Sequence, residues 1–295
     1  MPETIPQEES SGPRVSAILV AYNQAEALRR SIQALEQSAG RERLEILVVD
    51  CGSQDESARM DSEFRGINML RLPHHLGAAR AMNIAVRTAK AELLFFVSPD
   101  VEVEPATVTA LADRLEAASG AAAVCPLLVD EGGRPASRIA KLPTKESLAA
   151  ACHGQAPAPA PLDLAQERIA VEYPSLDALL VRKVFLRGMN YFDQRFGHHW
   201  ADADLAMQAR RAAKTIHLFP GIRARLHSAP DPLAEDSLAR ADLISGAAAF
   251  LGKYDGAMAG WAFRLKAAFQ ALARFDLAQF TAVLAGRKLD GSQAA

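Results

Sequence analysis

Four short segments of the chain carry side chains that could do chemistry together. They cover residues 15–23, 46–50, 94–100 and 200–205. The first three are apolar runs that end in polar residues, and the fourth places Asp202 and Asp204 at the start of an expected helix. Ligands of an open α/β sheet bind at the carboxyl ends of its parallel strands, so these polar ends should meet. They indicate a nucleotide-sugar site with a divalent metal and a base.

The ends of the first two runs offer groups for a nucleobase. Tyr22 could stack on the ring and Asn23 could hydrogen-bond to it, whereas Asp50 could accept the N–H of a pyrimidine. Each residue also has an ordinary explanation. Asn is a common turn residue, and an Asp after a strand often closes an Asx turn or caps the next helix. Position alone leaves both interpretations open.

Gly77, Arg80 and Asn83 lie near the start of an expected helix at 77–89. Backbone N–H groups at a helix start, together with an Arg, suit a diphosphate. The alternative is an ordinary helix with a surface Arg.

Asp100 is the expected metal ligand. Mg²⁺ and Mn²⁺ prefer carboxylate and phosphate oxygens, so one or two protein carboxylates suffice when a diphosphate supplies the rest. Glu102 could assist, and His227, at the end of a strand-like run, could complete the site as a neutral imidazole. Alternatively, the acids favour the N-terminus of the following helix, and His227 simply faces solvent.

Asp202 is the expected catalytic base for a sugar acceptor hydroxyl, because a positioned carboxylate is a usual choice for that proton. Helix chemistry offers another explanation, with Asp202 as an N-cap and Asp204 in the first turn.

Composition narrows the class of protein. The 295 residues are 49% hydrophobic and 23% charged, which predicts a packed core. The net charge of −2 argues against a general nucleic-acid binder. Cys51, Cys125 and Cys152 are widely spaced and odd in number, as expected of reduced thiols. The first ten residues lack a signal-peptide core, and no apolar run is long enough for a membrane span. We therefore expect a cytoplasmic protein.

The alternation of strand-like and helical segments predicts an α/β fold with parallel βαβ units. We expect a disordered tail at 1–13, a catalytic domain at 14–228 and a helical extension at 229–295. Within the domain, residues 130–163 are interpreted as a long mobile insertion, because they contain Glu-Gly-Gly and an Ala-Pro repeat.

The order of these motifs resembles family 2 glycosyltransferases of the GT-A fold, especially rhamnosyltransferase-like members, from about Val15 to His227. The similar segments are Val-Ala-Tyr-Asn at 20–23, Val-Val-Asp-Cys-Gly-Ser-Gln-Asp-Glu-Ser at 48–57, His-Leu-Gly-Ala-Ala-Arg-Ala-Met-Asn at 75–83, Ser-Pro-Asp at 98–100, Asn-Tyr-Phe-Asp-Gln-Arg-Phe at 190–196 and Asp-Ala-Asp-Leu at 202–205. The chain departs from the family pattern at His75, Ser98, Asp177, Ala201 and Gln208.

The resemblance implies a mixed, mainly parallel Rossmann-like sheet and an inverting transfer from a nucleoside diphosphate sugar. The acceptor would be a saccharide or a lipid-linked hydroxyl in cell-surface polysaccharide or glycolipid synthesis. Asp202 would be the base, and Mg²⁺ or Mn²⁺ would lie at Asp100 and His227. The implied donor-side residues are Ala21, Tyr22, Asn23, Asp50, Gly77, Arg80, Asn83 and Ser98, and the acceptor-side residues are Asp177, Trp200 and Asp204. Because Ser98 and Ala201 replace expected acids, a degenerate relative that only binds a nucleotide sugar or a partner is the alternative.

The helical extension carries an apolar stripe that includes Trp261, Leu265 and Phe269, interleaved with Arg and Lys. A basic amphipathic helix can lie on a membrane surface, which would place the protein at the inner face of the membrane. Apolar stripes more often pack in a core, so packing on the catalytic domain or on a second subunit is the favoured interpretation.

Overall fold

A nine-stranded mixed sheet forms the centre of the computed structural model, which describes residues 12–136, 138–156, 158–228, 232–233 and 236–289. The strand order is β3-β2-β1-β4-β10-β6-β11-β5, and β8 pairs with β11. The strands are β1 (Val15–Ala21), β2 (Leu44–Asp50), β3 (Ile67–Arg71), β4 (Leu93–Val97), β5 (Val101–Val103), β6 (Ala121–Val129), β8 (Ile169–Val171), β10 (Ala178–Arg182) and β11 (Thr215–Leu226).

The first four strands run parallel, as the strand-helix alternation predicts. β1 pairs with both β2 and β4, and β3 continues the parallel half beyond β2. The other half is mixed, because β10 runs antiparallel to β4 and β6, whereas β11 runs parallel to β6. The predicted fold class is therefore confirmed as a mixed, mainly parallel α/β sheet.

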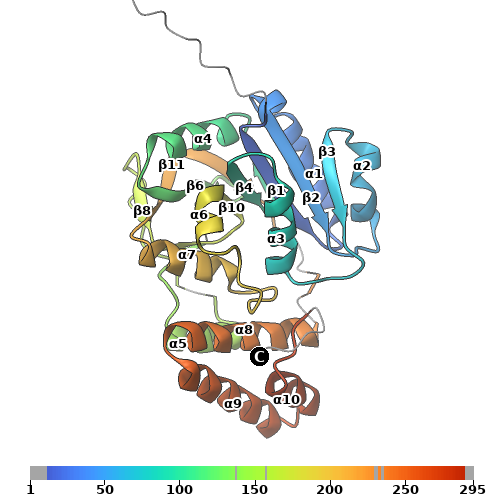
Figure 1. Ribbon diagram of the computed structural model, residues 1–295, viewed down its shortest axis with the longest axis vertical. Helices are drawn as coiled ribbons and strands as arrows, with labels where there is room; N and C mark the ends of the chain where they lie inside the picture. Colours follow the sequence, from blue (N-terminus) through green and yellow to red (C-terminus); the bar gives the residue numbers. More distant parts are fainter. Residues whose placement is uncertain (1–11, 137, 157, 229–231, 234–235, 290–295) are drawn as a thin grey trace, which may run out of the picture.

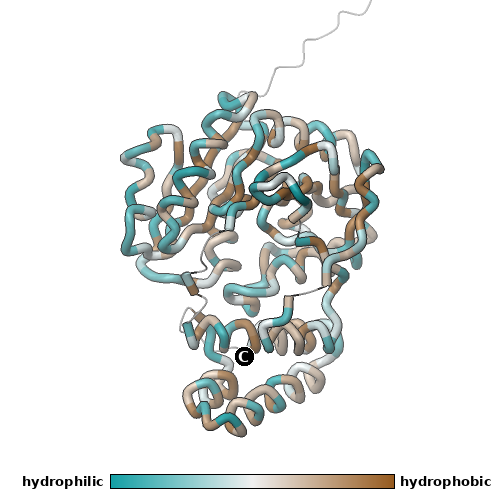
Figure 2. The backbone as a smooth tube through the Cα atoms, turned by 180° about the vertical axis from the view of Figure 1, so that it is seen from behind, coloured by the Kyte–Doolittle hydropathy of each residue, from teal (hydrophilic) through white to brown (hydrophobic). Residues whose placement is uncertain are grey.

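Helices cover both faces of the sheet (Figure 1). α1 and α4 bury their apolar faces on one side, and α3, α6 and α7 bury theirs on the other. Hydrophobic segments run mainly through the middle of this body in the view from behind (Figure 2). The helices are α1 (Ala25–Glu36), α2 (Met60–Glu63), α3 (Ala78–Thr88), α4 (Thr107–Ala117), α5 (Lys145–Cys152), α6 (Lys183–Gly188), α7 (Ala201–Arg211), α8 (Ser237–Tyr254), α9 (Ala257–Ala273) and α10 (Leu277–Leu284), with 3₁₀ turns η1 (Arg41–Arg43) and η2 (Glu56–Arg59).

The segment expected as a mobile insertion contains regular structure. It includes α5 and β7 (Ile139–Ala140), which pairs with β9 (Tyr173–Pro174). A capping box starts α5: the Thr144 side chain accepts from the Ser147 N–H, and the Ser147 hydroxyl accepts from the Thr144 N–H. Leu148 and Cys152 are buried in the same core cluster as residues of α8. The Ala-Pro repeat made this short helix hard to recognise in the sequence. The mobility of residues 130–163 stays a prediction.

The final helices form the end of the molecule that lies away from the sheet (Figure 1). α8 lies between the sheet domain and α9, and α10 packs on α9. No helix among the described residues is long and apolar enough to cross a bilayer. Most of the expected disordered tail at 1–13 lies outside the described residues.

Candidate active site

A cavity of about 770 Å³ lies at the carboxyl ends of β1 and β4. Its other walls come from the segments before α7 and before β10, and from α5 and α8. Seven of the residues expected in the site line it: Ala21, Tyr22, Ser98, Asp100, Asp177, Trp200 and Asp202. The other seven lie outside the lining: Asn23, Asp50, Gly77, Arg80, Asn83, Asp204 and His227.

The residues at the ends of β1 and β2 are tied together by hydrogen bonds. Asp50 stands opposite Ala21 in the strand register, is buried, and accepts from the Ser53 N–H at 3.3 Å. Asn23 has a φ of +51° and accepts from the Gln54 N–H at 2.7 Å. Both residues therefore make the turn contacts that the sequence left as alternatives, and they lie next to the cavity wall.

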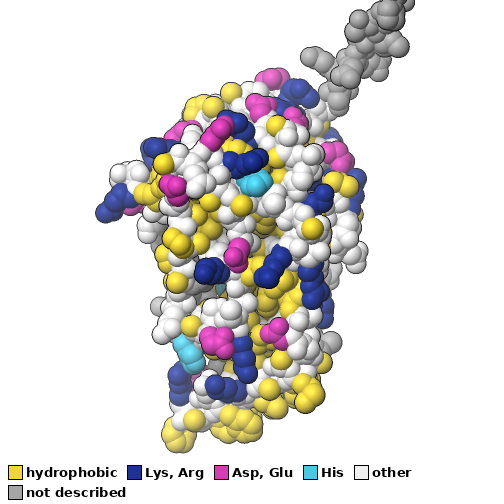
Figure 3. Space-filling model, turned by 90° about the vertical axis from the view of Figure 1, so that its left-hand side faces the viewer, with side chains coloured by type: hydrophobic (Ala, Val, Ile, Leu, Met, Phe, Trp, Pro, Cys, Tyr) yellow, Lys and Arg dark blue, Asp and Glu magenta, His cyan; other side chains and the backbone are white. Residues whose placement is uncertain are grey.

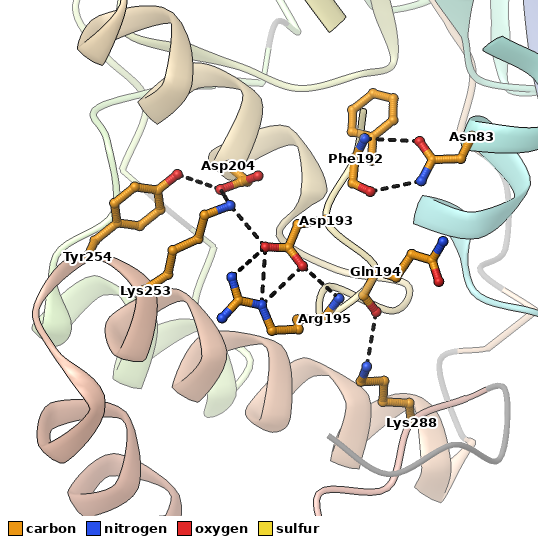
Figure 4. Close-up of polar contacts among 9 residues, drawn as sticks. All are labelled: Asn83, Phe192, Asp193, Gln194, Arg195, Asp204, Lys253, Tyr254 and Lys288. Atoms are coloured by element: carbon orange, nitrogen blue, oxygen red, sulfur yellow. Dashed lines mark hydrogen bonds and ion pairs between the residues drawn. The ribbon is translucent and has the colours of Figure 1, made fainter. Parts of the chain in front are cut away.

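The start of α3 is held by close backbone packing. Gly77 has a φ of +81°, and a Cβ there would lie 2.9 Å from the carbonyl oxygen of Gly197. Asn83 is buried and exchanges two hydrogen bonds with the backbone of Phe192, at 2.8 and 2.9 Å (Figure 4). Its amide is thus committed to fixing the segment before α7. Arg80 is half-buried on the same helix.

The carboxylate of Asp100 is not fully hydrogen-bonded by the described residues. Its Oδ1 is buried and has no hydrogen-bond partner among them. The backbone N–H of His227 donates to the Asp100 carbonyl at 2.9 Å, so the two residues are neighbours. The His227 ring, however, lies 2.7 Å from Glu102 and 3.2 Å from Glu131. No group of three or more His, Cys, Asp or Glu within the described ranges is arranged to hold a metal.

Asp202 lies at the start of α7 and accepts from the Ala203 N–H at 2.8 Å. Burial, with a smaller contribution from the charge of Asp177, raises the pKa of Asp202 to about 6, although the hydrogen bonds with the Ala203 N–H and with Tyr173 lower it. Burial also raises the pKa of Asp177, which Ser175 and Arg138 contact at 2.7 and 3.3 Å. The charge of Asp100 also contributes to the raised pKa of Asp177.

Asp204 faces the other side of α7. Its Oδ1 accepts from the Tyr254 hydroxyl and lies 2.8 Å from Lys253 Nζ (Figure 4). Lys253 also contacts Asp193 at 3.0 Å. The side chain is 1% exposed, so it is committed to packing α7 on α8.

Aromatic rings form a further wall that sequence reasoning did not assemble. The rings of Tyr22 and His75 meet edge to face at 5.1 Å, and His198 meets His75 at 5.4 Å. His199 packs on His198 at 4.8 Å, and burial, with the charge of His198, lowers the His199 pKa to about 3. In the sequence, the adjacent pairs His74-His75 and His198-His199 are the signal that could have indicated this wall. Tyr173 gave none, because its strand, β9, has only two residues and shows no periodicity in the sequence.

The C-terminal helices hold the segment that leads into α7. Asp242 of α8 is buried and accepts from the backbone N–H of His198 at 2.9 Å and of Leu289 at 3.0 Å. A Cβ on Gly197 would lie 2.0 Å from a carboxylate oxygen of Asp242, so only glycine fits there. Trp200, at a φ of +72°, donates from Nε1 to the Leu243 carbonyl at 2.9 Å.

Comparison with known proteins bears on what this cavity does. Residues 16–154 match the family model described as Glycosyl transferase family 2. A 91-residue stretch is 32% identical to "Uncharacterized glycosyltransferase YfnE" of Bacillus subtilis (strain 168), covering 30% of this chain and 23% of that protein. A crystal structure of GalNAc-T7 with UDP, GalNAc and Mn²⁺ superposes with a TM-score of 0.58 at 14% identity, covering 75% of this chain and 45% of that one. The chain thus spans less than half the length of either protein.

Proposed function

The chain carries a family 2 glycosyltransferase domain of the GT-A fold, and from that premise we propose that it moves a sugar from a nucleoside diphosphate sugar to an acceptor hydroxyl. The observation that carries the proposal is the cavity itself. It brings Asp100, with a buried and unpartnered carboxylate oxygen, together with Asp202, a buried carboxyl of raised pKa.

The donor side of the cavity fits a divalent cation. Asp100 Oδ1 is a hard oxygen ligand with no partner among the described residues, and a single carboxylate is enough when a diphosphate supplies further oxygens. Asp100 would hold Mg²⁺ or Mn²⁺, and the cation would neutralise charge on the leaving diphosphate. His227 would enter this shell only after its ring left Glu102 and Glu131. That GalNAc-T7, a protein of similar fold, was solved with UDP and Mn²⁺ supports a divalent metal in this proposal.

The base would be Asp202. In an inverting transfer, the acceptor oxygen forms a bond to the anomeric carbon while the bond to the diphosphate breaks, and Asp202 takes the hydroxyl proton. With a pKa of about 6 it is charged at neutral pH and is a stronger base than an ordinary Asp. Tyr173 holds the carboxylate by a hydrogen bond, and Asp177 and Trp200 line the acceptor side beside it.

The remaining details of the proposal follow the family resemblance. The donor would carry a hexose or deoxyhexose, with Tyr22 and Asp50 near its base. The acceptor would be a saccharide or a lipid-linked hydroxyl used in cell-surface polysaccharide or glycolipid synthesis, on the cytoplasmic side.

Calorimetry with uridine and thymidine diphosphates tests the donor site, with and without Mn²⁺. We expect Mn²⁺-dependent binding, and Asp100→Asn should weaken it by at least roughly 10–100-fold, the loss typical even of outer-shell partners. Glu104→Gln removes an exposed carboxylate nearby and serves as the matched control. Mn²⁺-independent binding, or equal binding by the Asp100 variant, would contradict the proposed metal role.

The second candidate function is binding without transfer. Ala201 lines the cavity where the family usually has Glu, so the wall beside Asp202 lacks one carboxylate. Nucleotide binding with no sugar transfer or donor hydrolysis across a donor panel would favour this candidate. Turnover with any donor would exclude it.

A further inference from the structure

The outer side of α9 and α10 exposes large apolar side chains that the fold does not use. We call this surface the α9–α10 face; Met258, Trp261, Phe269, Leu272, Phe275 and Leu277 define it. Phe275 is 93% exposed, Met258 is 87% and Trp261 is 60%. Figure 3 shows hydrophobic side chains gathered at the end of the molecule that these helices form. A contiguous apolar patch of this kind usually marks an interaction surface.

The packing of α9 on α8 uses the inner side of α9. Phe263, Ala268 and Ala271 are buried there. A Cβ on Gly260 would lie 2.5 Å from the Ala248 carbonyl, so the two helices are in close contact. On α9 itself, Met258 and Trp261 are three positions apart, as are Phe269 and Leu272, and all four stay at least 37% exposed on the side away from these buried residues. The Phe269 ring meets Phe280 of α10 at 6.5 Å and is still 61% exposed. The internal core therefore does not account for the outer stripe.

The charge around the α9–α10 face indicates which kind of partner binds there. Residues 257–288 contain five Lys and Arg but one acid, although the whole chain has a net charge of −2. The acid, Asp276, accepts from the Gln279 N–H and so caps α10. Lys266, Arg274 and Arg287 are exposed. A second copy would bring the same basic side chains against themselves in a two-fold interface, whereas an anionic lipid surface attracts them.

We propose that the α9–α10 face docks onto an anionic lipid bilayer. Its aromatic and aliphatic side chains enter the boundary between headgroups and acyl chains, as they do in interfacial amphipathic helices. Lys266 and Arg274 lie near the anionic headgroups. This inference does not rest on sugar transfer, because none of the residues that define the face lines the cavity, and α8 lies between the sheet domain and α9 (Figure 1).

Sedimentation of the full chain with vesicles tests the proposal. One set is phosphatidylcholine alone, and the other is phosphatidylcholine mixed with phosphatidylglycerol. We expect binding to the mixed vesicles that weakens with added salt. Lys266→Glu with Arg274→Glu should reduce the partition coefficient about tenfold or more, because each basic residue near an anionic surface contributes about 1 kcal/mol.

Met258→Ser with Phe275→Asn tests the apolar part, and Asn tolerates the φ of +61° at position 275. The charge variant and this apolar variant should both lower vesicle binding. Two controls should not change it: Val184→Ser, at a 63% exposed site on α6, and Arg43→Glu, at an exposed site in η1. Circular dichroism and nucleotide binding confirm that each variant is folded. Absent vesicle binding, or equal binding of wild type and face variants, overturns the proposal. So does a lipid-free dimer that the same substitutions dissociate.

Discussion

Asp202 and Asp204 lie on different faces of α7 and have different surroundings. Asp202 faces the cavity, and burial raises its pKa to about 6. Asp204, two residues later, faces α8 and is paired with Lys253 and Tyr254 (Figure 4). Residues two apart on an α-helix do not share a face, so the spacing itself separates them. The difference teaches that a carboxylate without a cationic partner is poised for chemistry, whereas a paired one holds the architecture.

The sharpest test of this comparison is turnover. Asp202→Asn should lower kcat by about 10²–10⁴, the range a positioned general base supplies, while donor affinity is kept. Asp204→Asn should leave the kcat of folded protein nearly unchanged. The measurement is a sugar-transfer assay combined with calorimetric donor binding. Equal losses in both variants would erase the distinction between the two sides.

Stability should respond to the same pair of substitutions with opposite signs. Asp204→Asn weakens charge-assisted bonds to Lys253 and Tyr254 and should lower the free energy of unfolding by about 1.5–3 kcal/mol. Asp202→Asn removes a carboxylate that burial disfavours, and should raise that free energy by about 1–3 kcal/mol at neutral pH. Urea unfolding at pH 7 measures both. A destabilised Asp202 variant would mean that its carboxylate contributes to the fold.

The pH profile of transfer gives the smallest expected effect. Because the folded pKa of Asp202 is raised, the carboxyl holds its proton up to about pH 6, and kcat should fall about tenfold per pH unit below that value. The raised pKa also means that the contribution of this group to stability decreases as pH rises from about 4 to 6. The profile of Asp202→Asn should lose this limb, and its persistence would assign the titration to another group.

Much of the sheet was predictable because its strands are continuous apolar runs. Every residue of β2 and β4 is buried, and such runs between helical segments indicate parallel strands covered on both faces. Strand β11 runs from Thr215 to Leu226 without a break, with an irregularity in its pairing between Phe219 and Arg223. Pro220 and Gly221 made that irregularity look like a turn in the sequence.

The site was predictable at the strand ends but less so where side chains choose partners. Ala21, Tyr22, Ser98 and Asp100 follow from strand register, and all of them line the cavity. From the sequence, Asp204 and Asn83 could be ligand-binding or structural residues. Their structural partners, Lys253 and Phe192, are 49 and 109 positions away and could not be identified from local pattern. Tyr173, which hydrogen-bonds to Asp202, lies in the two-residue strand β9, which is too short for a periodic pattern to predict. Local sequence patterns therefore do not predict which polar side chains pair with partners far along the chain.

The contact between Asp242 and the Gly197–His198 backbone links the helical extension directly to the wall of the cavity. A protein shortened after β11 would leave the His198 amide and the space beside Gly197 to water. Local unfolding of α8 would therefore loosen residues 197–200, and a ligand that orders this segment should protect the α8 amides from hydrogen exchange. We therefore expect the sheet and the last helices to unfold as one cooperative unit, although they look separate in Figure 1.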